Sequence, residues 1–377
     1  MRHPRLFEDH HIWVLAPSVI SQDPNITYYY DFEQSILEYT RVFEELNLSW
    51  NWQYVTLHDY KEVIASIKEK SLDKKTLVFN LCDGDEVNEA PGISVIRELE
   101  NSGLSYTGSR EYFYEMTTSK IPMKRKFDAC GIPNAPWEVI QQDGKNVKGL
   151  FDRLPGPLII KPAVSGGSMG LGISNVVHNE EECLRIIDKI NEGYRGWNLT
   201  VDGIFAEQFI PGKEYTSFLV GSFDNPSEII YYKPVERVFN SKLPVTEQFL
   251  SFDRLWETYD EESSLGDDQF LFNYYEPEQE FQEEIRRLSL DSFQCLNGTG
   301  YTRIDIRKDE RDGHCYVLEA NAQCGISEDE NYTSIGAILR LSGKTFSKLV
   351  LEILHDAWIR YENRKLNQSA AGNNARA

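Results

Sequence analysis

The chain has 377 residues, a length that suits two or three domains better than a single hydrophobic core. Its 39 basic and 60 acidic residues give a net charge of -21, which argues against nucleic acid or an anionic membrane as a partner. The N-terminus lacks the apolar run of a signal peptide, and no stretch of about 18 uninterrupted apolar residues occurs. We therefore expect a soluble, cytoplasmic protein in which local cations or metal hold any bound phosphate.

The cysteines are scattered along the chain and include no CxxC pair. In a chain of this length, such spacing predicts reduced thiols and neither a disulfide framework nor a zinc site. They are Cys82, Cys130, Cys183, Cys295, Cys315 and Cys324.

About the first 115 residues alternate strand and helix patterns, as a parallel sheet requires. Strands are expected at 11–15, 52–57 and 76–81, and helices at 31–46 and 61–70. Ligands of such sheets bind beyond the carboxyl ends of the strands. Asp83, which follows the third strand, is therefore a candidate substrate contact, with an ordinary solvated turn as the alternative.

A second unit begins near Thr117, with a helix through Lys120 and Lys124 that ends at Cys130-Gly131. A short strand at 157–162 carries Lys161 and leads into the sequence SGGSMGLG, residues 165–172. Glycines leave backbone N–H groups unobstructed, so this loop is suited to folding over phosphates. It matches neither the Walker pattern nor GxGxxG, and a plain connector is the alternative.

A third unit begins near Gly203 with a strand that carries Glu207, followed by a turn at Pro211-Gly212 and then Glu214. Residues 223–280 give mixed signals and no assignment. Helices are expected at 279–297 and at 346–358, the second as a core element without chemistry. The Ala- and Asn-rich tail is expected to be disordered.

The most informative pattern is Arg303-Ile304-Asp305 followed, after a polar turn, by Glu319-Ala320-Asn321. Alternation along a strand places Arg303 and Asp305 on one face, and likewise Glu319 and Asn321. Antiparallel pairing of the two strands would present one cation and three oxygen ligands to one point, as a magnesium-bound triphosphate requires. An ordinary hairpin with solvated charges is the alternative.

Taken in order, the segments TSK, IIKPAVSGGSMG, AEQFIPGKE, RIDI and LEANAQCGIS resemble the ATP-grasp superfamily and, within it, the D-alanine:D-alanine ligase group. The resemblance runs from about Asn80 to His355. It implies an α/β (α+β) ATP-grasp fold of three domains. An N-terminal parallel-sheet substrate domain would span 1–116, two α+β subdomains holding ATP between them would span 117–209 and 210–362, and a disordered tail would span 363–377.

The resemblance implies a role for each nucleotide-binding motif. Lys120 and Lys161 match the lysines that hold ATP phosphates, and the loop would cover them. Glu207 matches the acceptor of the adenine amino group, and Glu214 the acceptor of the ribose hydroxyls. The other implied nucleotide contacts are Gly166, Gly167 and Ser168 in the loop, and Phe209 and Ile210 in the purine slot.

The resemblance also implies the catalytic set. Asp305, Glu319 and Asn321 match the ligands of two Mg²⁺ ions, for which Mn²⁺ could substitute. Arg303 matches the arginine over the transferred phosphate, and the Gly325 N–H would be an oxyanion donor, with Ser168 in the covering loop.

The implied reaction joins the carboxylate and the amine of small amino-acid-like molecules. ATP converts the carboxylate to an acyl phosphate, the amine attacks it, and ADP and phosphate are released. The chain would contribute orientation, charge neutralisation and exclusion of water. A nucleophilic thiol at Cys324 is not needed. Relatives of this kind are commonly homodimers, and neither nucleic acid nor a membrane is an expected partner.

Three departures from the family pattern concern the substrates. No acid precedes Asp23 in the turn after the first strand, where relatives that join two D-alanines carry a glutamate. Leu255 replaces a lysine in the flexible loop of the third domain, where the neighbouring Arg254 could substitute. The acids Glu328, Asp329 and Glu330 stand where hydroxyl-bearing residues hold the acceptor's carboxylate, which makes Glu330 a candidate contact for a cationic acceptor.

Three other interpretations remain open from the sequence. The chain could be an authentic D-alanine:D-alanine ligase, which the missing glutamate and lysine disfavour. It could be an ATP-binding regulator without activity, which the retention of Arg303, Asp305, Glu319 and Asn321 disfavours. A carboxylase subunit of the same superfamily is disfavoured because no biotin-attachment motif is present.

Overall fold

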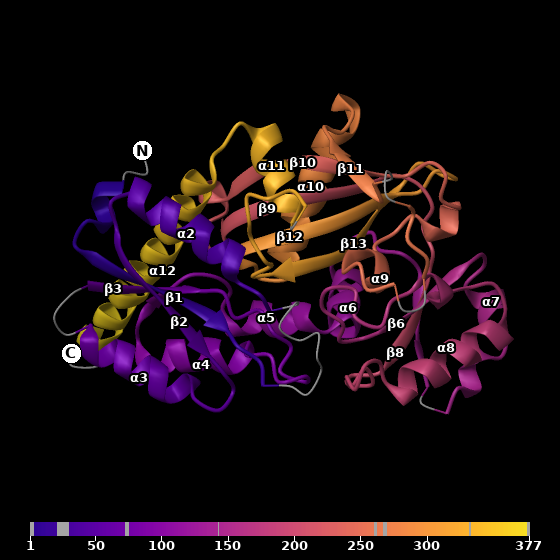
Figure 1. The fold of residues 1–377 in the computed structure, drawn as a ribbon, viewed down its shortest axis with the longest axis horizontal. Coiled ribbons are helices and arrows are strands. Elements are labelled where there is room, and N and C mark those ends of the chain that lie inside the picture. Colours follow the sequence, from indigo (N-terminus) through magenta and orange to yellow (C-terminus); the bar gives the residue numbers. More distant parts are fainter. Residues whose placement is uncertain are drawn as a thin grey trace.

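The computed structural model describes residues 4–20, 30–71, 75–141, 143–259, 262–266, 270–331 and 333–374. Three β-sheets with flanking helices organise these residues (Figure 1). None of the helices formed by them is both long enough and apolar enough to cross a bilayer.

The first sheet is parallel and has the strand order β2-β1-β3-β4. This confirms the parallel sheet predicted for the N-terminal region. Its strands are β1 (His10–Pro17), β2 (Ser49–Val55), β3 (Lys75–Asn80) and β4 (Ser105–Tyr106), and its helices are η1 (Pro4–Phe7), α2 (Glu33–Glu45), α3 (Tyr60–Lys70), α4 (Ile93–Ser102) and α5 (Glu111–Thr118).

Alternation along β1 supplies both faces of this sheet with apolar residues. Ile12 and Val14 contact a core that includes α2 and the last helix, α12 (Phe346–Asn374). Trp13 and Leu15 contact a separate core beneath α3 and α4. The C-terminal helix therefore packs on the N-terminal sheet, as Figure 1 shows.

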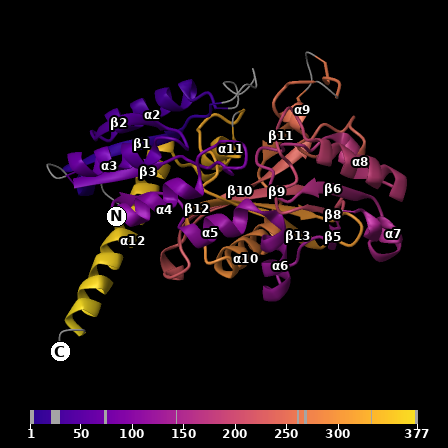
Figure 2. The same ribbon diagram turned by 90° about the horizontal axis from the view of Figure 1, so that it is seen from below.

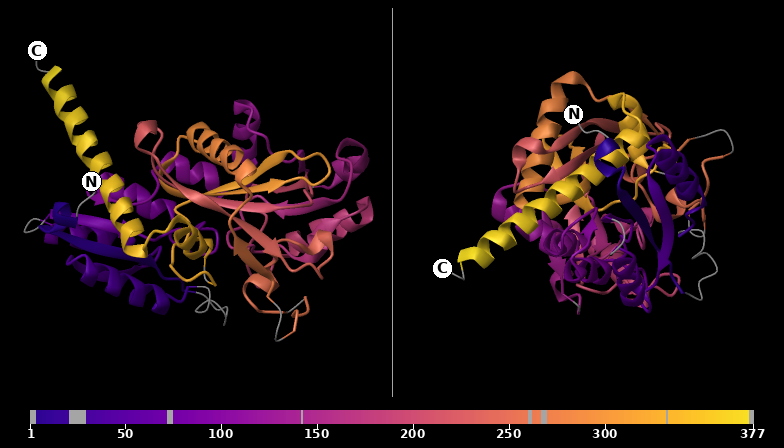
Figure 3. Two further views of the ribbon diagram at one scale, coloured as in Figure 1. Left: turned by 90° about the horizontal axis from the view of Figure 1, so that it is seen from above. Right: turned by 90° about the vertical axis from the view of Figure 1, so that its left-hand side faces the viewer.

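Helix α12 also differs from the expectation drawn from the sequence. The sequence predicts a disordered tail from residue 363, but the helix continues to Asn374 and projects from the molecule (Figure 3). Arg364, Lys365 and Leu366 are good helix formers, and no proline interrupts this segment. Residues 375–377 lie outside the described part of the chain.

The second sheet has the strand order β5-β8-β6-β7 with antiparallel pairing. Apolar residues of β6 and β8 pack against α8 in one core. The strands are β5 (Trp137–Ile140), β6 (Leu158–Pro162), β7 (Val176–Val177) and β8 (Ile204–Gln208), and the helices are α6 (Lys120–Cys130), η2 (Lys145–Val147), α7 (Leu150–Arg153), η3 (Ile173–Asn175) and α8 (Glu180–Glu192).

The third sheet is antiparallel and has the order β11-β10-β9-β12-β13. It lies beside the second sheet, and α10 packs on one of its two faces (Figure 2). Its strands are β9 (Glu214–Ser222), β10 (Ile230–Phe239), β11 (Phe272–Tyr275), β12 (Thr299–Lys308) and β13 (Cys315–Ala322), and its helices are η4 (Pro226–Glu228), η5 (Val245–Glu247), α9 (Phe252–Leu255), α10 (Gln279–Cys295) and α11 (Ser334–Ser342).

Side-chain alternation gives the third sheet one apolar face. Ile304 and Ile306 of β12 pack against α10. The residues between and beside them in sequence, Arg303, Asp305 and Arg307, therefore lie on the opposite face.

The expectation of six reduced thiols is wrong at one pair. Cys130 at the end of α6 and Cys295 at the end of α10 form a disulfide, although 165 residues separate them in sequence. Spacing in the sequence cannot reveal such a pair, because only the packing of α6 beside α10 brings the two ends together. The other four cysteines are free and buried.

Thiol labelling tests this pairing. Alkylation of the unfolded protein without reductant should modify Cys82, Cys183, Cys315 and Cys324 only. Cys130 and Cys295 should become reactive after reduction, and peptide mass mapping identifies them. Modification of all six cysteines before reduction would contradict the assignment.

Candidate active site

The hairpin of β12 and β13 brings four predicted side chains together. The two strands pair antiparallel, as predicted, and in their register Arg303 lies opposite Asn321 and Asp305 lies opposite Glu319. Arg303 Nε donates to Asp305 Oδ2 at 3.1 Å. Asn321 Nδ2 donates to the same oxygen at 3.1 Å and to Glu319 Oε1 at 3.3 Å. One cation and three oxygen-bearing groups thus share one face of the sheet.

The donor set of this hairpin fits a hard divalent cation, since two carboxylates and one amide supply oxygen ligands. Among the described residues, no three His, Cys, Asp or Glu side chains cluster as a metal site, so the third ligand would be Asn321. Burial raises the pKa of Asp305, although Arg303 opposes this. Burial acts likewise on Glu319, but Lys120 and Arg303 outweigh it and lower the pKa of this group.

Lys120, the first residue of α6, reaches the hairpin from the second sheet. Its Nζ lies 3.4 Å from Glu319 Oε2 and donates to the Ser165 carbonyl at 2.8 Å. Ser165 begins the Gly-rich loop. Lys120 therefore lies between a predicted metal ligand and the predicted phosphate loop.

Glu207 on β8 is buried between two lysines. One oxygen pairs with Lys161, and the other lies 2.6 Å from Lys124 Nζ. Burial alone would raise the pKa of Glu207, but the two ammonium groups lower it to about 2. Burial lowers the pKa of Lys124, which is 1% exposed, while Glu207 opposes that shift.

Both carboxylate oxygens of Glu207 thus face ammonium groups, and the expected contact with an adenine amino group stays a prediction. Lys124 had no predicted role beyond its place in the helix. Its position one turn after Lys120 was the available signal, since residues i and i+4 share a helix face.

The Gly-rich loop adopts backbone conformations that favour glycine. Gly167, Ser168 and Gly170 have φ angles of 54°, 63° and 72°. Gly166 and Gly167 are exposed. The Gly167 carbonyl accepts from Trp256 Nε1 at 2.8 Å. The loop therefore contacts the residue that follows α9, a segment of the third unit.

The predicted purine slot is a small apolar cluster. Phe209 packs there with Ile159, Val176 and Phe249, and the ring centroids of Phe209 and Phe249 lie 6.2 Å apart. Ile210, the next residue along the chain, is 2% exposed. Phe249 lies in the region that the sequence left unassigned, so the sequence indicated only one side of this cluster.

Glu214, the predicted ribose acceptor, is buried between two arginines that the sequence analysis did not single out. Arg237 Nη1 pairs with Glu214 Oε1, and Arg307 Nε donates to Glu214 Oε2 at 3.1 Å. Both arginines neighbour Glu214 because β9 lies between β10 and β12. This adjacency of strands is a property of the fold, and no local sequence pattern predicts it.

Asp83 lies near the turn that follows β13. Gln323 fixes this relation, because its Nε2 donates to the Cys82 carbonyl at 2.7 Å and its Oε1 accepts from Ser109 N at 3.1 Å. The side chain of Asp83 is exposed, but protein surrounds it at longer range, and burial raises its pKa to about 6. In the part of the chain that the structure describes, no cation pairs with this carboxylate.

The turn itself presents Gly325 beside open space, since a Cβ at this position would have no atom of another segment within 4 Å. Burial raises the pKa of Cys324 to about 12, which keeps its thiol protonated at neutral pH and agrees with the absence of a nucleophilic role. Glu328 pairs with Arg41, and Glu330 accepts from Arg340 Nη2 at 2.9 Å. These arginines weaken the expected attraction of the acids for a cationic acceptor.

The structure also describes the surroundings of the missing lysine and the missing glutamate of the family pattern. Arg254, the neighbour of the missing lysine, pairs with Glu247 at 2.6 Å and lies 3.3 Å from Glu262, so acids of the same chain already balance its charge. Leu255 ends α9 and carries no charge. β1 ends at Pro17, and Asp23 lies outside the described residues.

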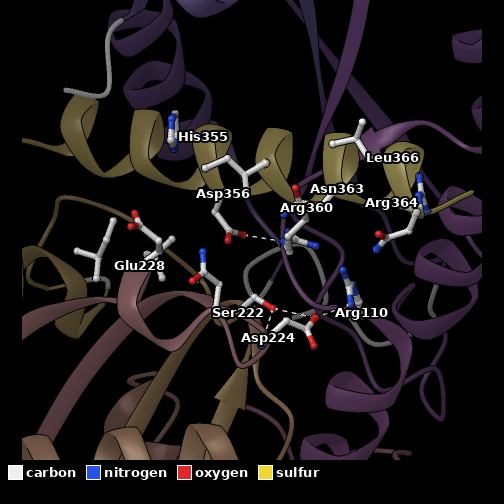
Figure 4. Close-up of a pocket in the computed structure, with 16 residues that line it drawn as sticks. Arg110, Ser222, Asp224, Glu228, His355, Asp356, Arg360, Asn363, Arg364 and Leu366 are labelled. Carbon is white, nitrogen blue, oxygen red and sulfur yellow. Dashed lines mark hydrogen bonds and ion pairs between the residues drawn. The ribbon is translucent and has the colours of Figure 1, made fainter. Parts of the chain in front are cut away.

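A cavity of about 760 Å³ lies elsewhere, between α12 and the turn after β9 (Figure 4). Two of its arginines pair with acids of the same chain, and the third, Arg364, donates to the Leu104 carbonyl. Arg110 lies 3.2 Å from Asp224, and Arg360 lies 2.8 Å from Asp356. The residues that line this cavity include none of the predicted site residues.

Glu207→Gln tests the buried lysine pair, since it leaves Lys124 and Lys161 without a shared anion. Removing one partner of a buried ion pair costs about 3–5 kcal/mol, so urea unfolding at pH 7 should show a loss of about 3 kcal/mol. The pKa of Glu207 is lowered from 4.5 to about 2. The stabilisation is therefore complete above pH 4.5 and disappears as the pH falls towards 2.

Glu181→Gln is the control, because Glu181 on α8 is 82% exposed and should change little. If Glu207→Gln lowers the free energy of unfolding equally at pH 2.5 and at pH 7, the ionic explanation is wrong.

Comparisons with known proteins identify the family of the chain. The model of the family described as D-ala D-ala ligase C-terminus matches residues 127–355, more than half of the chain. The D-alanine–D-alanine ligase of Nitrosococcus oceani is 26% identical over 259 residues, covering 68% of this chain and 70% of the relative. That of Idiomarina loihiensis is 24% identical over 307 residues, covering 80% and 86%.

Solved structures resemble the whole fold. The D-alanine–D-alanine ligase from Bacillus anthracis complexed with ATP has a TM-score of 0.63 and 18% identity, covering 94% of this chain and 99% of that one. The ligase from Coxiella burnetii has a TM-score of 0.65 and 15% identity, covering 98% and 100%. These likenesses show the ATP-grasp fold. With the match of the family model, they establish that the chain belongs to the D-ala D-ala ligase C-terminus family and is an ATP-grasp carboxylate–amine ligase.

Proposed function

We propose that this ligase binds Mg²⁺ and ATP at the site cluster, defined as the ten charged groups Arg237, Arg303, Arg307, Lys120, Lys124, Lys161, Glu207, Glu214, Asp305 and Glu319. The observation that supports this most directly is the charge of the cluster. Six cations face four acids there, although the whole chain carries a net charge of -21. A polyphosphate supplies the anionic charge that the cluster lacks.

In this proposal Lys120 and Lys161 hold ATP phosphates. Lys120 now contacts Glu319 and Lys161 contacts Glu207, so each is held at its place before the nucleotide binds. Phe209, Ile210 and Phe249 bind the base, and Glu214 accepts from the ribose. Gly166, Gly167 and Ser168 cover the phosphates and keep water from the reacting groups.

Asp305, Glu319 and Asn321 would hold the metal, and bound Mg²⁺ would neutralise charge on the transferred phosphate. Arg303 orients that phosphate. The carboxylate of one substrate attacks the γ-phosphorus, which gives an acyl phosphate and ADP. The amine of the second substrate then attacks the acyl carbon, the new C–N bond forms and phosphate leaves. The Gly325 N–H, beside open space, stabilises the oxyanion.

For the substrates we propose small amino-acid-like molecules, one of them with a cationic amine near Asp83. Asp83 follows β3 and has an exposed carboxylate close to the Cys324–Gly325 turn. The second candidate is joining of two D-alanines, which the names of the relatives favour. Two residues favour a pair of substrates other than two D-alanines. One is Leu255, and the other is Glu330, which stands where the family pattern has a hydroxyl-bearing residue.

We further propose that the enzyme acts in the cytoplasm, where ATP is supplied. The Cys130–Cys295 disulfide is uncommon for that compartment. The thiol-labelling experiment therefore also tests the proposed location when it uses protein kept under cytoplasmic redox conditions.

The enzyme should release phosphate from Mg-ATP only with a matching pair of substrates. A panel of D- and L-amino acids and simple amines, D-alanine and basic amino acids included, identifies the pair by phosphate release and product mass. Glu319→Gln should lower kcat by about 100-fold or more and raise the Mg²⁺ requirement, since a charged ligand is lost. Glu310→Gln, in the turn after β12, is the control. ATP bound but not consumed with any pair would contradict the proposal.

Asp83 should make substrate binding pH-dependent. Its carboxyl group has a raised pKa of about 6, so it is neutral below that pH and anionic above it. The KM of the amine-bearing substrate should rise as the pH falls through 6. Asp83→Asn should raise this KM by about tenfold at pH 7.5 and abolish its rise between pH 7.5 and pH 5. Asp143→Asn, in the exposed turn after β5, should leave that pH dependence of the KM unchanged. An unchanged pH profile in Asp83→Asn would count against a cationic substrate.

A further inference from the structure

We propose that Arg307 is a positioning residue for the base and ribose of the nucleotide, holding together the separate segments that form the slot. The inference rests on the proposed function and adds to it a role for a residue that the sequence did not single out. Arg307 lies on β12, two residues beyond Asp305, on the same face of the sheet.

The contacts of Arg307 reach three segments of the chain. Its Nε donates to Glu214 Oε2 at 3.1 Å, and its Nη1 donates to the Ile210 carbonyl at 2.9 Å. Its Nη2 donates to the Gln248 carbonyl. The guanidinium group, with its N–H donors in a fixed planar fork, thus connects the start of β9, the linker after β8 and the segment after η5.

These segments carry the groups that form the slot. Phe249 follows Gln248 and packs against Phe209, which precedes Ile210. The guanidinium carbon of Arg307 lies 5.3 Å from the centroid of the Phe209 ring. Arg307 therefore sets the distance between the two aromatic walls and the direction of the Glu214 carboxylate.

Burial makes these connections rigid. Arg307 is 3% exposed, and Glu214 is 6% exposed. A lysine at this position would keep the charge but has no planar fork, so it cannot make the same three contacts. Arg237 provides a matched comparison. It binds the other oxygen of Glu214, but its Nε and Nη2 donate to the Tyr274 hydroxyl and not to the base segments.

Calorimetric titration with two ligands tests the role. Mg-ATP contains base, ribose and phosphates, whereas Mg-tripolyphosphate contains only the phosphates. In Arg307→Lys the Kd of Mg-ATP should rise by about 10- to 100-fold, since two or more charge-assisted hydrogen bonds are lost. The Kd of Mg-tripolyphosphate should stay within about twofold of the wild-type value.

Variants of other arginines separate this role from general stability. Arg237→Lys should weaken Mg-ATP less than Arg307→Lys, because the Ile210 and Gln248 contacts remain. Arg287→Lys, on the exposed side of α10, should change neither constant. A melting temperature for each variant identifies misfolded protein. Arg307→Met is the second variant if Arg307→Lys does not fold, and because it also removes a charge of the site cluster, the test for it is whether the Kd of Mg-ATP rises more than that of Mg-tripolyphosphate.

The outcomes distinguish this inference from the proposed function. Wild-type protein that binds neither ligand overturns both. Wild-type protein that binds Mg-ATP, with Arg307 variants that bind it equally well, overturns the positioning role alone. Arg307 variants that lose both ligands to the same extent also overturn it, because they indicate a general structural role. In the enzyme assay, support takes the form of a raised ATP KM with kcat within about threefold.

Discussion

The structure of this ligase depends on the alternation of side chains along β12. Ile304 and Ile306 bury one face of the strand against α10, and this burial fixes the opposite direction of Arg303, Asp305 and Arg307. A register shift of one residue would exchange the two sets, exposing two isoleucines and burying three charges in an apolar core. Burial of the apolar face of β12 therefore fixes the orientation of its charged face. The neighbouring strands β9 and β13 add Glu214 and Glu319 to that charged face.

Around this face, the molecule collects cations although its overall charge is strongly negative. Each lysine or arginine of the site cluster contacts an acid of the same cluster. The pairs differ in how deeply they are buried. Lys124 and Glu207 are 1% and 2% exposed, whereas Arg303 is 25% exposed. The buried pairs form a fixed frame, and the more exposed ones remain accessible to a phosphate. In the proposed function, the more exposed Lys120, Lys161 and Arg303 are the groups that contact the nucleotide phosphates.

The substrate side of the proposed site differs in charge from what the run of three acids predicts. Two of the three acids after Gly325 are neutralised by arginines of other elements, Arg41 on α2 and Arg340 on α11. These acids therefore attract a cationic acceptor less than their sequence suggests, and the exposed carboxylate of Asp83 is the better candidate contact. Gln323 places that carboxylate beside the Cys324–Gly325 turn by bonding to Cys82 and Ser109. In the proposed function, recognition of the amine thus depends on contacts between the first and third sheets.

The sequence by itself determined the parallel N-terminal sheet, the hairpin of Arg303 to Asn321 and the order of the ATP-grasp motifs. Alternation, turn residues and motif order are local properties, so they can be read along the chain. Only the tertiary structure decided the Cys130–Cys295 pair, the enclosure of Glu207 by Lys124 and Lys161, and the two arginines on Glu214. These contacts join residues far apart in sequence or depend on which strands lie side by side. Their energies come from burial and from neighbouring charges, which exist only after the sheets and helices have packed.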